Sequence, residues 1–330
     1  MFSKKCFNNS INNIKNCKFI YKTLLHKNKR LSEKYKCNIF FKREDLQNTR
    51  SFKIRGAYNK IKNLIINKNL NNINIVSASA GNHAQGISLT CNELKITHDI
   101  FLPKITPLQK INRIKYFGNK YLTLHLIGNN FDESLNAAND YCNNNESIFV
   151  HPFDDEDVIF GQATIGYEIY EDINPDIIII PIGGGGLVSG IGQYSKIKNP
   201  KCLIYGIEPS GADSMNVSIK NNKITTLDNI NTFVDGACVK KVGEKTFNIS
   251  RNVIDNIYII NNNQLSHTMV DIYQNEGIIL EPAGALSISC LDNINKSKLK
   301  NKNIVCVLSG GNNDISRYPD ILEKSLLYQK

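Results

Sequence analysis

The sequence predicts an α/β protein built on parallel sheets, and three observations support this prediction. The chain repeats one plan: a short apolar run, a turn of small residues, and then a helical pattern. Four consecutive isoleucines at 177–180 are typical of a strand buried on both faces, as parallel strands are. Three turns that follow such strands, SASAGNH, GGGG and SGGNN, are small and polar. Because ligands gather at the carboxyl ends of parallel strands, we expect the functional site at these turns.

The individual elements follow from local composition. β-branched runs predict strands, and apolar residues at helical spacing predict helices. The Asn-rich stretches near 59–74 and 139–145 are expected at helix ends and in loops. In chain order, the expected units are a strand, turn and helix at 72–94, a strand and a helix starting near Thr106 and Pro107 at 98–118, a strand, glycine turn and helix at 175–197, a strand running into a loop at 201–214, a strand and helix at 252–277, and a buried strand at 303–314.

Composition narrows the class of protein. A chain of 330 residues is long enough for about two domains. The net charge of +10 comes from lysines scattered among Asn and Ile, which does not indicate a nucleic-acid groove. The nine cysteines are dispersed and never form CxxC, so we expect reduced thiols and a cytoplasmic location. No apolar run approaches the ~18 residues of a membrane span, although the basic start of the chain leaves a transit peptide as an alternative.

The run of four glycines at 183–186 stands between the isoleucine strand and a helix, where backbone N–H groups can hold a phosphate. A tight turn without a ligand is one alternative. Another is an NAD(P)-binding oxidoreductase, in which Gly184, Gly186 and Gly190 form GxGxxxG and Glu208 binds a ribose. These glycines lack the GxGxxG spacing that is typical of dinucleotide sites. A third is a non-catalytic protein that binds phosphate or nucleic acid.

One lysine, Lys53, lies between an aromatic and a β-branched residue, whereas most lysines lie in polar runs. A phosphate site together with an isolated lysine suggests pyridoxal 5'-phosphate, whose aldehyde forms a Schiff base with a lysine amine. From sequence context alone, a lysine at the surface or at the edge of the core remains an alternative.

Six motifs, in order over most of the chain, carry a family resemblance: FKREDLQNTRSFKIRGAYNKI, SASAGNHAQG, PIGGGGLVSG, FVDGACVKKVGEKTF, EPAGALS and LSGGNNDISR. The chain resembles the serine/threonine dehydratase family of fold type II pyridoxal phosphate enzymes, and within it the catalytic domain of the biosynthetic threonine dehydratases. The resemblance implies a tryptophan synthase β-like fold, with two three-layer α/β domains and the cofactor in the cleft between them.

The resemblance also implies roles for residues of this chain. The implied roles are a Schiff-base and catalytic lysine at Lys53, a ring contact at Phe52, a ring-hydroxyl partner at Asn82, a phosphate turn at Gly183, Gly184, Gly185, Gly186 and Leu187, a pyridine-nitrogen partner at Ser309, and a substrate-carboxylate loop at Ser79, Ala80, Gly81, Asn82 and His83. Two of these roles have alternatives: Ser309 could only cap a turn, and His83 could contribute only its backbone N–H.

The implied reaction is β-elimination from L-threonine to give 2-oxobutanoate and ammonia, the first step of isoleucine biosynthesis, with L-serine as a secondary substrate. Catabolic serine/threonine dehydratases and serine racemases are the alternatives. Ala80 stands where racemases carry a serine, and Arg50 stands where catabolic enzymes and racemases carry glycine. The catabolic and the racemase alternatives are therefore both disfavoured. Glu208 is the one metal candidate, but Ser214 replaces an expected aspartate ligand, so we expect no metal.

The resemblance implies a large cofactor-binding domain from residues 1–72 and 146–330, an inserted small domain at 73–145, and a homodimer or homotetramer. Biosynthetic relatives continue into a regulatory domain that binds isoleucine. This chain stops at ILEKSLLYQK, so we expect no regulatory domain and no inhibition by isoleucine.

Overall fold

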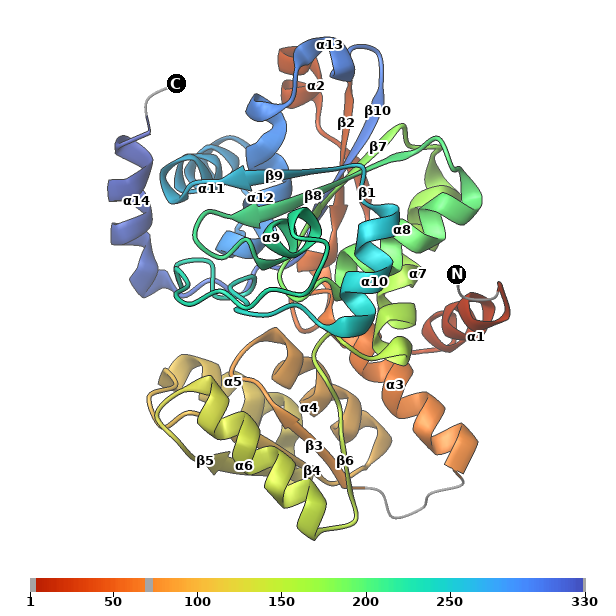
Figure 1. Cartoon of the computed structure of the whole chain (residues 1–330), viewed down its shortest axis with the longest axis vertical. Helices are drawn as coiled ribbons and strands as arrows, with labels where there is room; N and C mark the ends of the chain where they lie inside the picture. The colour runs from red at the N-terminus through yellow and green to blue at the C-terminus, as the bar shows by residue number, and fades with distance from the viewer. Residues whose placement is uncertain (1–3, 69–73, 329–330) are drawn as a thin grey trace.

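The computed structural model describes residues 4–68 and 74–328, whose strands form two sheets. The six-stranded sheet has the order β1-β2-β10-β7-β8-β9 and the four-stranded sheet the order β5-β4-β3-β6. In the view of Figure 1, the larger sheet lies above the smaller one. All pairs are parallel except β1 with β2. The strands are β1 (Leu25–Lys27), β2 (Asn38–Arg43), β3 (Asn74–Ala78), β4 (His98–Leu102), β5 (Leu122–Leu126), β6 (Ser147–Phe149), β7 (Ile177–Pro181), β8 (Leu203–Pro209), β9 (Asn256–Ile260) and β10 (Asn303–Leu308).

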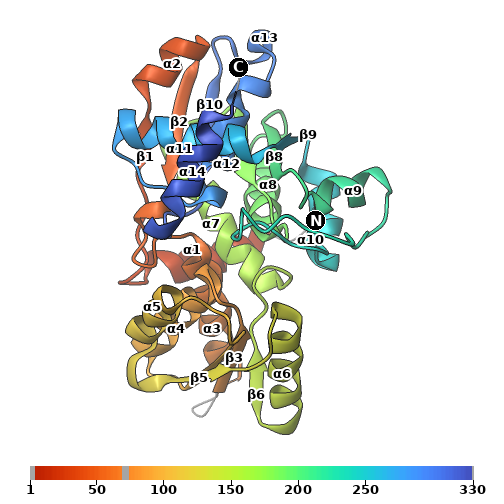
Figure 2. The same ribbon diagram turned by 90° about the vertical axis from the view of Figure 1, so that its left-hand side faces the viewer.

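Helices connect the strands and cover both sheets, as the two perpendicular views show (Figures 1 and 2). The α-helices are α1 (Lys4–Lys15), α2 (Lys29–Tyr35), α3 (Lys53–Lys68), α4 (Asn82–Leu94), α5 (Leu108–Gly118), α6 (Phe131–Asn144), α7 (Glu156–Asp172), α8 (Gly186–Lys198), α9 (Ser214–Lys220), α10 (Glu244–Val253), α11 (Asn262–Glu276), α12 (Pro282–Ser289), α13 (Lys296–Leu299) and α14 (Tyr318–Leu326). Short 3-10 helices are η1 (Glu44–Leu46), η2 (Asn119–Tyr121), η3 (Cys290–Asn293) and η4 (Ile315–Arg317).

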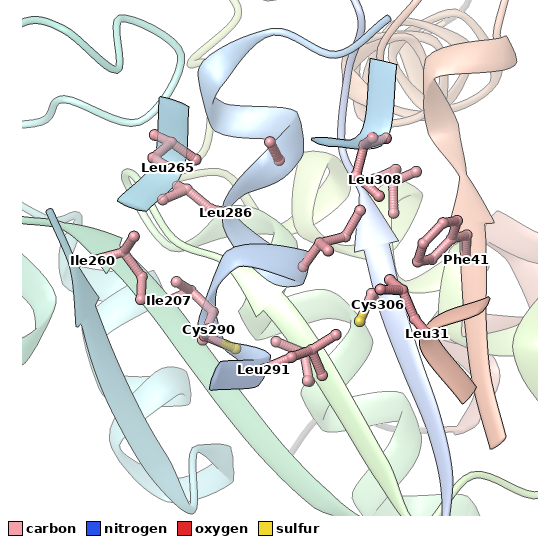
Figure 3. Close-up of a cluster of buried hydrophobic side chains, with 14 of the residues drawn as sticks. Leu31, Phe41, Ile207, Ile260, Leu265, Leu286, Cys290, Leu291, Cys306 and Leu308 are labelled. Carbon is pink, nitrogen blue, oxygen red and sulfur yellow. The ribbon is translucent and has the colours of Figure 1, made fainter. Parts of the chain in front are cut away.

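The isoleucine run of β7 is buried on both faces. Ile177 and Ile179 belong to a core formed with α2, α11, α12 and α14, whereas Ile178 and Ile180 belong to a core formed with α7, α8 and α10. Figure 3 shows the first core, with Leu286 of α12 among the strand side chains. Successive side chains of a strand point to opposite faces, so a run without alternation needs helices on both sides. The prediction of a fully buried parallel strand is confirmed.

The smaller sheet is covered in the same way. Ile75 and Ile100 pack with side chains of α3, α4 and α5, and Val76 and Phe101 pack with α6 on the other face. The SASAGNH segment begins at the C-terminal end of β3 and leads directly into α4.

Most predicted units are confirmed, since β3 with α4, β4 with α5, β7 with α8, β9 with α11, and β10 lie where expected. The strand running into a loop at 201–214 is confirmed by β8 and the turn after it, whereas α9, which begins at Ser214, was not predicted. The strands β1, β2, β5 and β6 were not predicted, and β1 and β6 are only three residues long. Part of the Asn-rich stretch near 59–74 lies outside the described residues.

The nine cysteines are thiols and not disulfides, and most of them are buried. Among residues 4–68 and 74–328, no helix is both long and apolar enough to cross a membrane.

Candidate active site

One of the three polar turns, SGGNN, meets the lysine segment through backbone contacts. Ser51 forms an isolated bridge with Gly310, and the Phe52 N–H donates to the Ser309 carbonyl at 3.1 Å. These contacts hold the start of α3 against the end of β10, although the two segments are far apart in the sequence. Lys53, the first residue of α3, is therefore placed beside the SGGNN turn.

The Lys53 amine donates to the Pro152 carbonyl at 2.8 Å and lies 5.3 Å from the centre of the Phe52 ring. Protein atoms surround the amine closely enough that desolvation lowers the pKa of Lys53 to about 8, while the Glu281 carboxyl opposes the shift. Among the described residues, Lys53 forms no ion pair with a carboxylate. A lysine whose neutral form is accessible near neutral pH can act as a nucleophile or a base.

The glycine turn packs closely against both side-chain and backbone atoms of other segments. A Cβ at Gly184 would lie 2.3 Å from the Phe153 ring, and one at Gly183 would lie 3.0 Å from the Ala237 Cα. Gly185 has a φ of +93°, which disfavours any L side chain, and it begins α8 without a side-chain cap. The first N–H groups of α8 have no intrahelical partner, so this turn is suited to an anion. Phe153 follows Pro152, which links the turn to Lys53.

The SASAGNH turn holds Asn82 at the start of α4. The Asn82 amide donates to Glu281 at 2.7 Å, and its oxygen accepts from the Asn312 amide at 2.7 Å. His83 is buried and its Nε2 lies 3.0 Å from the Val150 carbonyl, so Nε2 carries the hydrogen. Burial lowers the pKa of His83 to about 3, and Lys53 adds to the shift, which leaves this imidazole neutral.

The remaining members of the predicted loop line the same turn. The Gly81 N–H donates to the Ser79 hydroxyl at 3.2 Å, and Ala80 packs partly against the core of the smaller sheet. On the opposite side, the buried Ser309 hydroxyl donates to the Ala283 carbonyl at 3.2 Å, and Leu187 packs into the core beneath α8. The turn after β3 meets the turn after β10 through the contact between Asn82 and Asn312.

Glu208, the one metal candidate, serves the protein differently. Its two carboxylate oxygens accept the N–H groups of Met215 at 2.9 Å and Asn216 at 2.8 Å, at the start of α9. Burial raises the pKa of Glu208 to about 8, and these two hydrogen bonds oppose the shift. Within the part of the chain that the structure describes, no group of three His, Cys, Asp or Glu side chains could hold a metal ion. The carboxylate caps a helix and is not free to grip a ribose.

A buried charge cluster next to Lys53 was not predicted. Arg55 and Lys42 are fully buried with Glu44, and Glu168 is nearly so. The Arg55 guanidinium contacts Glu44 at 2.8 Å and Glu168 at 2.6 Å, and Lys42 contacts Glu168 at 2.5 Å. Arg55 holds the pKa of Glu44 below its usual range although burial opposes this. The cluster joins β2, α3 and α7 beneath the first turn of α3.

Glu281 and Asn312 were also missed as site residues. Glu281 is only 6% exposed, and burial raises its pKa to about 7. A signal was present in the sequence, because Glu281 is an isolated acid in the apolar run IILEPAGAL. Its partner Asn82 lies 199 positions away, so only the fold shows the contact.

The residues brought together fit pyridoxal phosphate. The cofactor needs an amine for its aldehyde, an anion site for its phosphate, and polar partners for its ring oxygen and ring nitrogen. Lys53 supplies the amine, the side-chain-free turn with the left-handed Gly185 supplies the anion site, and the Asn82 amide and Ser309 hydroxyl are the polar groups at the facing turns.

Comparison with known proteins agrees with this fit. A family model described as pyridoxal-phosphate dependent enzyme matches residues 17–310. The L-threonine dehydratase biosynthetic IlvA of Halalkalibacterium halodurans is 46% identical over 309 residues, which cover 93% of this chain and 74% of that protein. Among solved structures, the processed form of threonine deaminase isoform 2 from Solanum lycopersicum matches with a TM-score of 0.89 and 34% identity, covering 98% of this chain and 94% of that chain.

Maize serine racemase has the same fold, with a TM-score of 0.88 and 26% identity over 98% of this chain and 97% of that chain. The match over nearly the whole chain contradicts the dinucleotide alternative and confirms the fold type II prediction. The chain belongs to the family of pyridoxal-phosphate-dependent enzymes.

Proposed function

We propose that this enzyme deaminates L-threonine to 2-oxobutanoate and ammonia by β-elimination, the first step of isoleucine biosynthesis. Relatives that are 44–46% identical over more than nine tenths of the chain bear the name of biosynthetic L-threonine dehydratase. The observation that carries the proposal is the desolvated Lys53 amine, which donates to the Pro152 carbonyl, while the next residue, Phe153, packs against a glycine turn suited to a phosphate.

Pyridoxal phosphate, when bound, supplies an electron sink that weakens the bonds at the substrate Cα and Cβ. Lys53 would hold the cofactor through its Nζ and would later accept the Cα proton on the same atom. The lowered pKa of Lys53, about 8, suits both roles, because an appreciable fraction of the amine is unprotonated near neutral pH. Phe52, half-buried and adjacent to the lysine, would lie against the ring.

The other predicted residues would bind and orient. Gly183, Gly184, Gly185, Gly186 and Leu187 would hold the phosphate with N–H groups at the start of α8, and Ser309 would face the ring nitrogen. A neutral hydroxyl does not stabilise a protonated ring as a carboxylate would, which favours elimination over transamination. The loop from Ser79 to His83 lies at the start of α4, where backbone N–H groups attract the substrate carboxylate.

A direct assay tests the proposal. The purified chain, supplied with pyridoxal phosphate, is expected to release 2-oxobutanoate and an equal amount of ammonia from L-threonine. L-serine should be a poorer substrate by about 10- to 100-fold in kcat/KM, because one methyl group in a pocket discriminates by only ~1–3 kcal/mol. No release from L-threonine, together with racemisation of serine, would sink the proposal in favour of the racemase alternative.

Several finer expectations stay predictions. These are the homo-oligomeric state, the cytoplasmic location and the use of L-serine. Two separate sheets support the division into a large domain of residues 1–72 and 146–330 and a small domain of residues 73–145. β6 belongs to the smaller sheet but lies just past residue 145, the predicted end of the small domain.

Gly184→Ala is expected to weaken binding of pyridoxal phosphate by at least ~10-fold and to lower the free energy of unfolding by ~1–3 kcal/mol. Its new Cβ would lie 2.3 Å from the Phe153 ring, which must move together with the turn beside Lys53. Gly166→Ala in α7 is the control, since its Cβ would meet Tyr194 at 3.3 Å. Titration with the cofactor and urea unfolding check both. Equal affinities for the two variants would contradict the prediction.

The stability of the cofactor-free protein is expected to depend on pH through Lys53. The pKa of Lys53 is about 8 in the folded protein and 10.5 by its ordinary value, so between these pH values the unfolded chain binds a proton that the folded chain does not. Stability should therefore rise with pH through this window, by at most about 3 kcal/mol. Lys53→Met should lack this rise, as measured by urea unfolding at several pH values. Parallel pH profiles for both proteins would count against a desolvated lysine.

A further inference from the structure

The polar network around Asn82 fixes the direction of its amide. Thr49 presents a backbone carbonyl, which only accepts, so the Asn312 amide nitrogen must face it, at 2.7 Å. The same nitrogen donates to the Asn82 oxygen at 2.7 Å. From the other side, the Glu281 carboxylate accepts from the Asn82 nitrogen at 2.7 Å. The two neighbours thus impose the same orientation on Asn82 independently.

The place of Glu281 suits this task. It is the residue before α12, it is 6% exposed, and the glycines around it leave room for its carboxylate. A Cβ at Gly310 would lie 2.4 Å from Glu281 Oε1, and one at Gly236 would lie 3.5 Å from it. In the part of the chain that the structure describes, no cation pairs with this carboxylate. A buried carboxylate without a cation costs stability, and such groups are concentrated at functional sites.

Because one N–H of Asn82 donates to Glu281 and its oxygen accepts from Asn312, its second N–H remains. We propose that Glu281 and Asn312 are positioning residues that commit Asn82 to donating a hydrogen bond to the cofactor's ring oxygen. The inference rests on the proposed function, since Asn82 is the predicted partner of that oxygen. Without the two neighbours, the Asn82 amide could rotate by half a turn and present its own oxygen.

The network also joins the two sheets. Asn82 follows a strand of the smaller sheet, whereas Glu281 and Asn312 belong to segments packed on the larger one. The orientation of Asn82 is therefore set by the sheet that also carries Ser309 and the glycine turn. Asn82 itself cannot be exchanged for aspartate without placing two carboxylates together at Glu281.

Asn312→Asp gives the sharpest test. Aspartate at this position only accepts, so it repels the Thr49 carbonyl and draws the Asn82 nitrogen away from Glu281. We expect affinity for pyridoxal phosphate, titrated into the cofactor-free chain and followed by absorbance, to fall by about 10- to 100-fold. Asn303→Asp is the matched control, since the Asn303 oxygen also accepts from an amide, that of Asn38, at 2.9 Å, and its nitrogen also faces a backbone carbonyl. The control should leave the affinity unchanged.

Glu281→Gln provides a second, nearly isosteric variant in case Asn312→Asp does not fold. It should lower cofactor affinity by about 5- to 10-fold, because the new amide no longer dictates which end of Asn82 faces it. A role through Asn82 is separated from a general structural role by repeating each change in Asn82→Ala. In that background neither change should alter affinity by more than about twofold.

Losses that persist undiminished in the Asn82→Ala background would overturn the inference, as would affinities of Asn312→Asp and Glu281→Gln equal to that of the wild type. The proposed function fails differently. If the wild-type chain neither binds pyridoxal phosphate nor deaminates L-threonine, the proposed function is wrong. If the wild type does both, but Asn312→Asp and Glu281→Gln act independently of Asn82, the function stands and only the positioning role is removed.

Discussion

Lys53→Ala is expected to lower deamination of L-threonine by about 10³-fold or more, because the variant loses both the cofactor amine and the base for the Cα proton. The Lys53 amine donates a hydrogen bond to the Pro152 carbonyl at 2.8 Å, next to Phe153, against which the glycine turn packs. Absorption spectra should show that the borohydride-sensitive band of the bound cofactor also disappears. The measurement is steady-state release of 2-oxobutanoate.

The matched control is Lys60→Ala, two turns further along α3. Lys60 pairs with Asp155 at 2.8 Å and with Asp157 at 3.3 Å, two carboxylates at the start of α7. We expect nearly wild-type activity and an unchanged spectrum. A Lys53→Ala enzyme that retains the band and a substantial part of its activity would show that another amine carries the cofactor.

Arg55→Met is expected to lower the free energy of unfolding by about 3–5 kcal/mol, the largest stability effect we predict. Burial would lower the pKa of Arg55, but Glu168 and Glu44 outweigh it and hold the guanidinium charged. Methionine leaves the two buried carboxylates with Lys42 as their remaining cation. Because the cluster lies under the first turn of α3, cofactor affinity should fall as well. Urea unfolding of the cofactor-free chain measures the loss.

An exposed ion pair provides the comparison. Lys302 contacts Asp176 at 3.0 Å, and its side chain is 49% exposed. Water screens such a pair, so Lys302→Met should cost less than about 1 kcal/mol. If Arg55→Met proves no more costly than Lys302→Met, the buried cluster does not anchor α3.

Local patterns predicted the central part of the fold and failed at its edges. The isoleucine run of β7 and the small-residue turns after β3, β7 and β10 are continuous in sequence, so composition alone indicates them. β1 and β6 are too short to produce a pattern, and each is stabilised by pairing, with β2 and β3 respectively. The start of α9 was missed because its acceptor, Glu208, lies in the preceding strand.

The site shows the same limit. Lys53 stood out because an isolated lysine between Phe52 and Ile54 needs an explanation, and the glycine run needed one too. Glu281 and Asn312 acquire their meaning only from contacts with a residue about 200 positions or more away. Glutamate and asparagine are common both at surfaces and in functional sites, so the sequence alone does not identify such residues as site residues. Their role becomes visible only when the fold brings them into contact with Asn82.

The central claim is that Lys53 bears the cofactor. Its most direct test is to reduce the purified holoenzyme with borohydride, digest it and locate the pyridoxyl phosphate group by mass spectrometry. We predict modification of the peptide that contains Lys53 and of no other lysine. An active enzyme whose label lies on a different lysine, or that carries no label after reduction, would contradict the account.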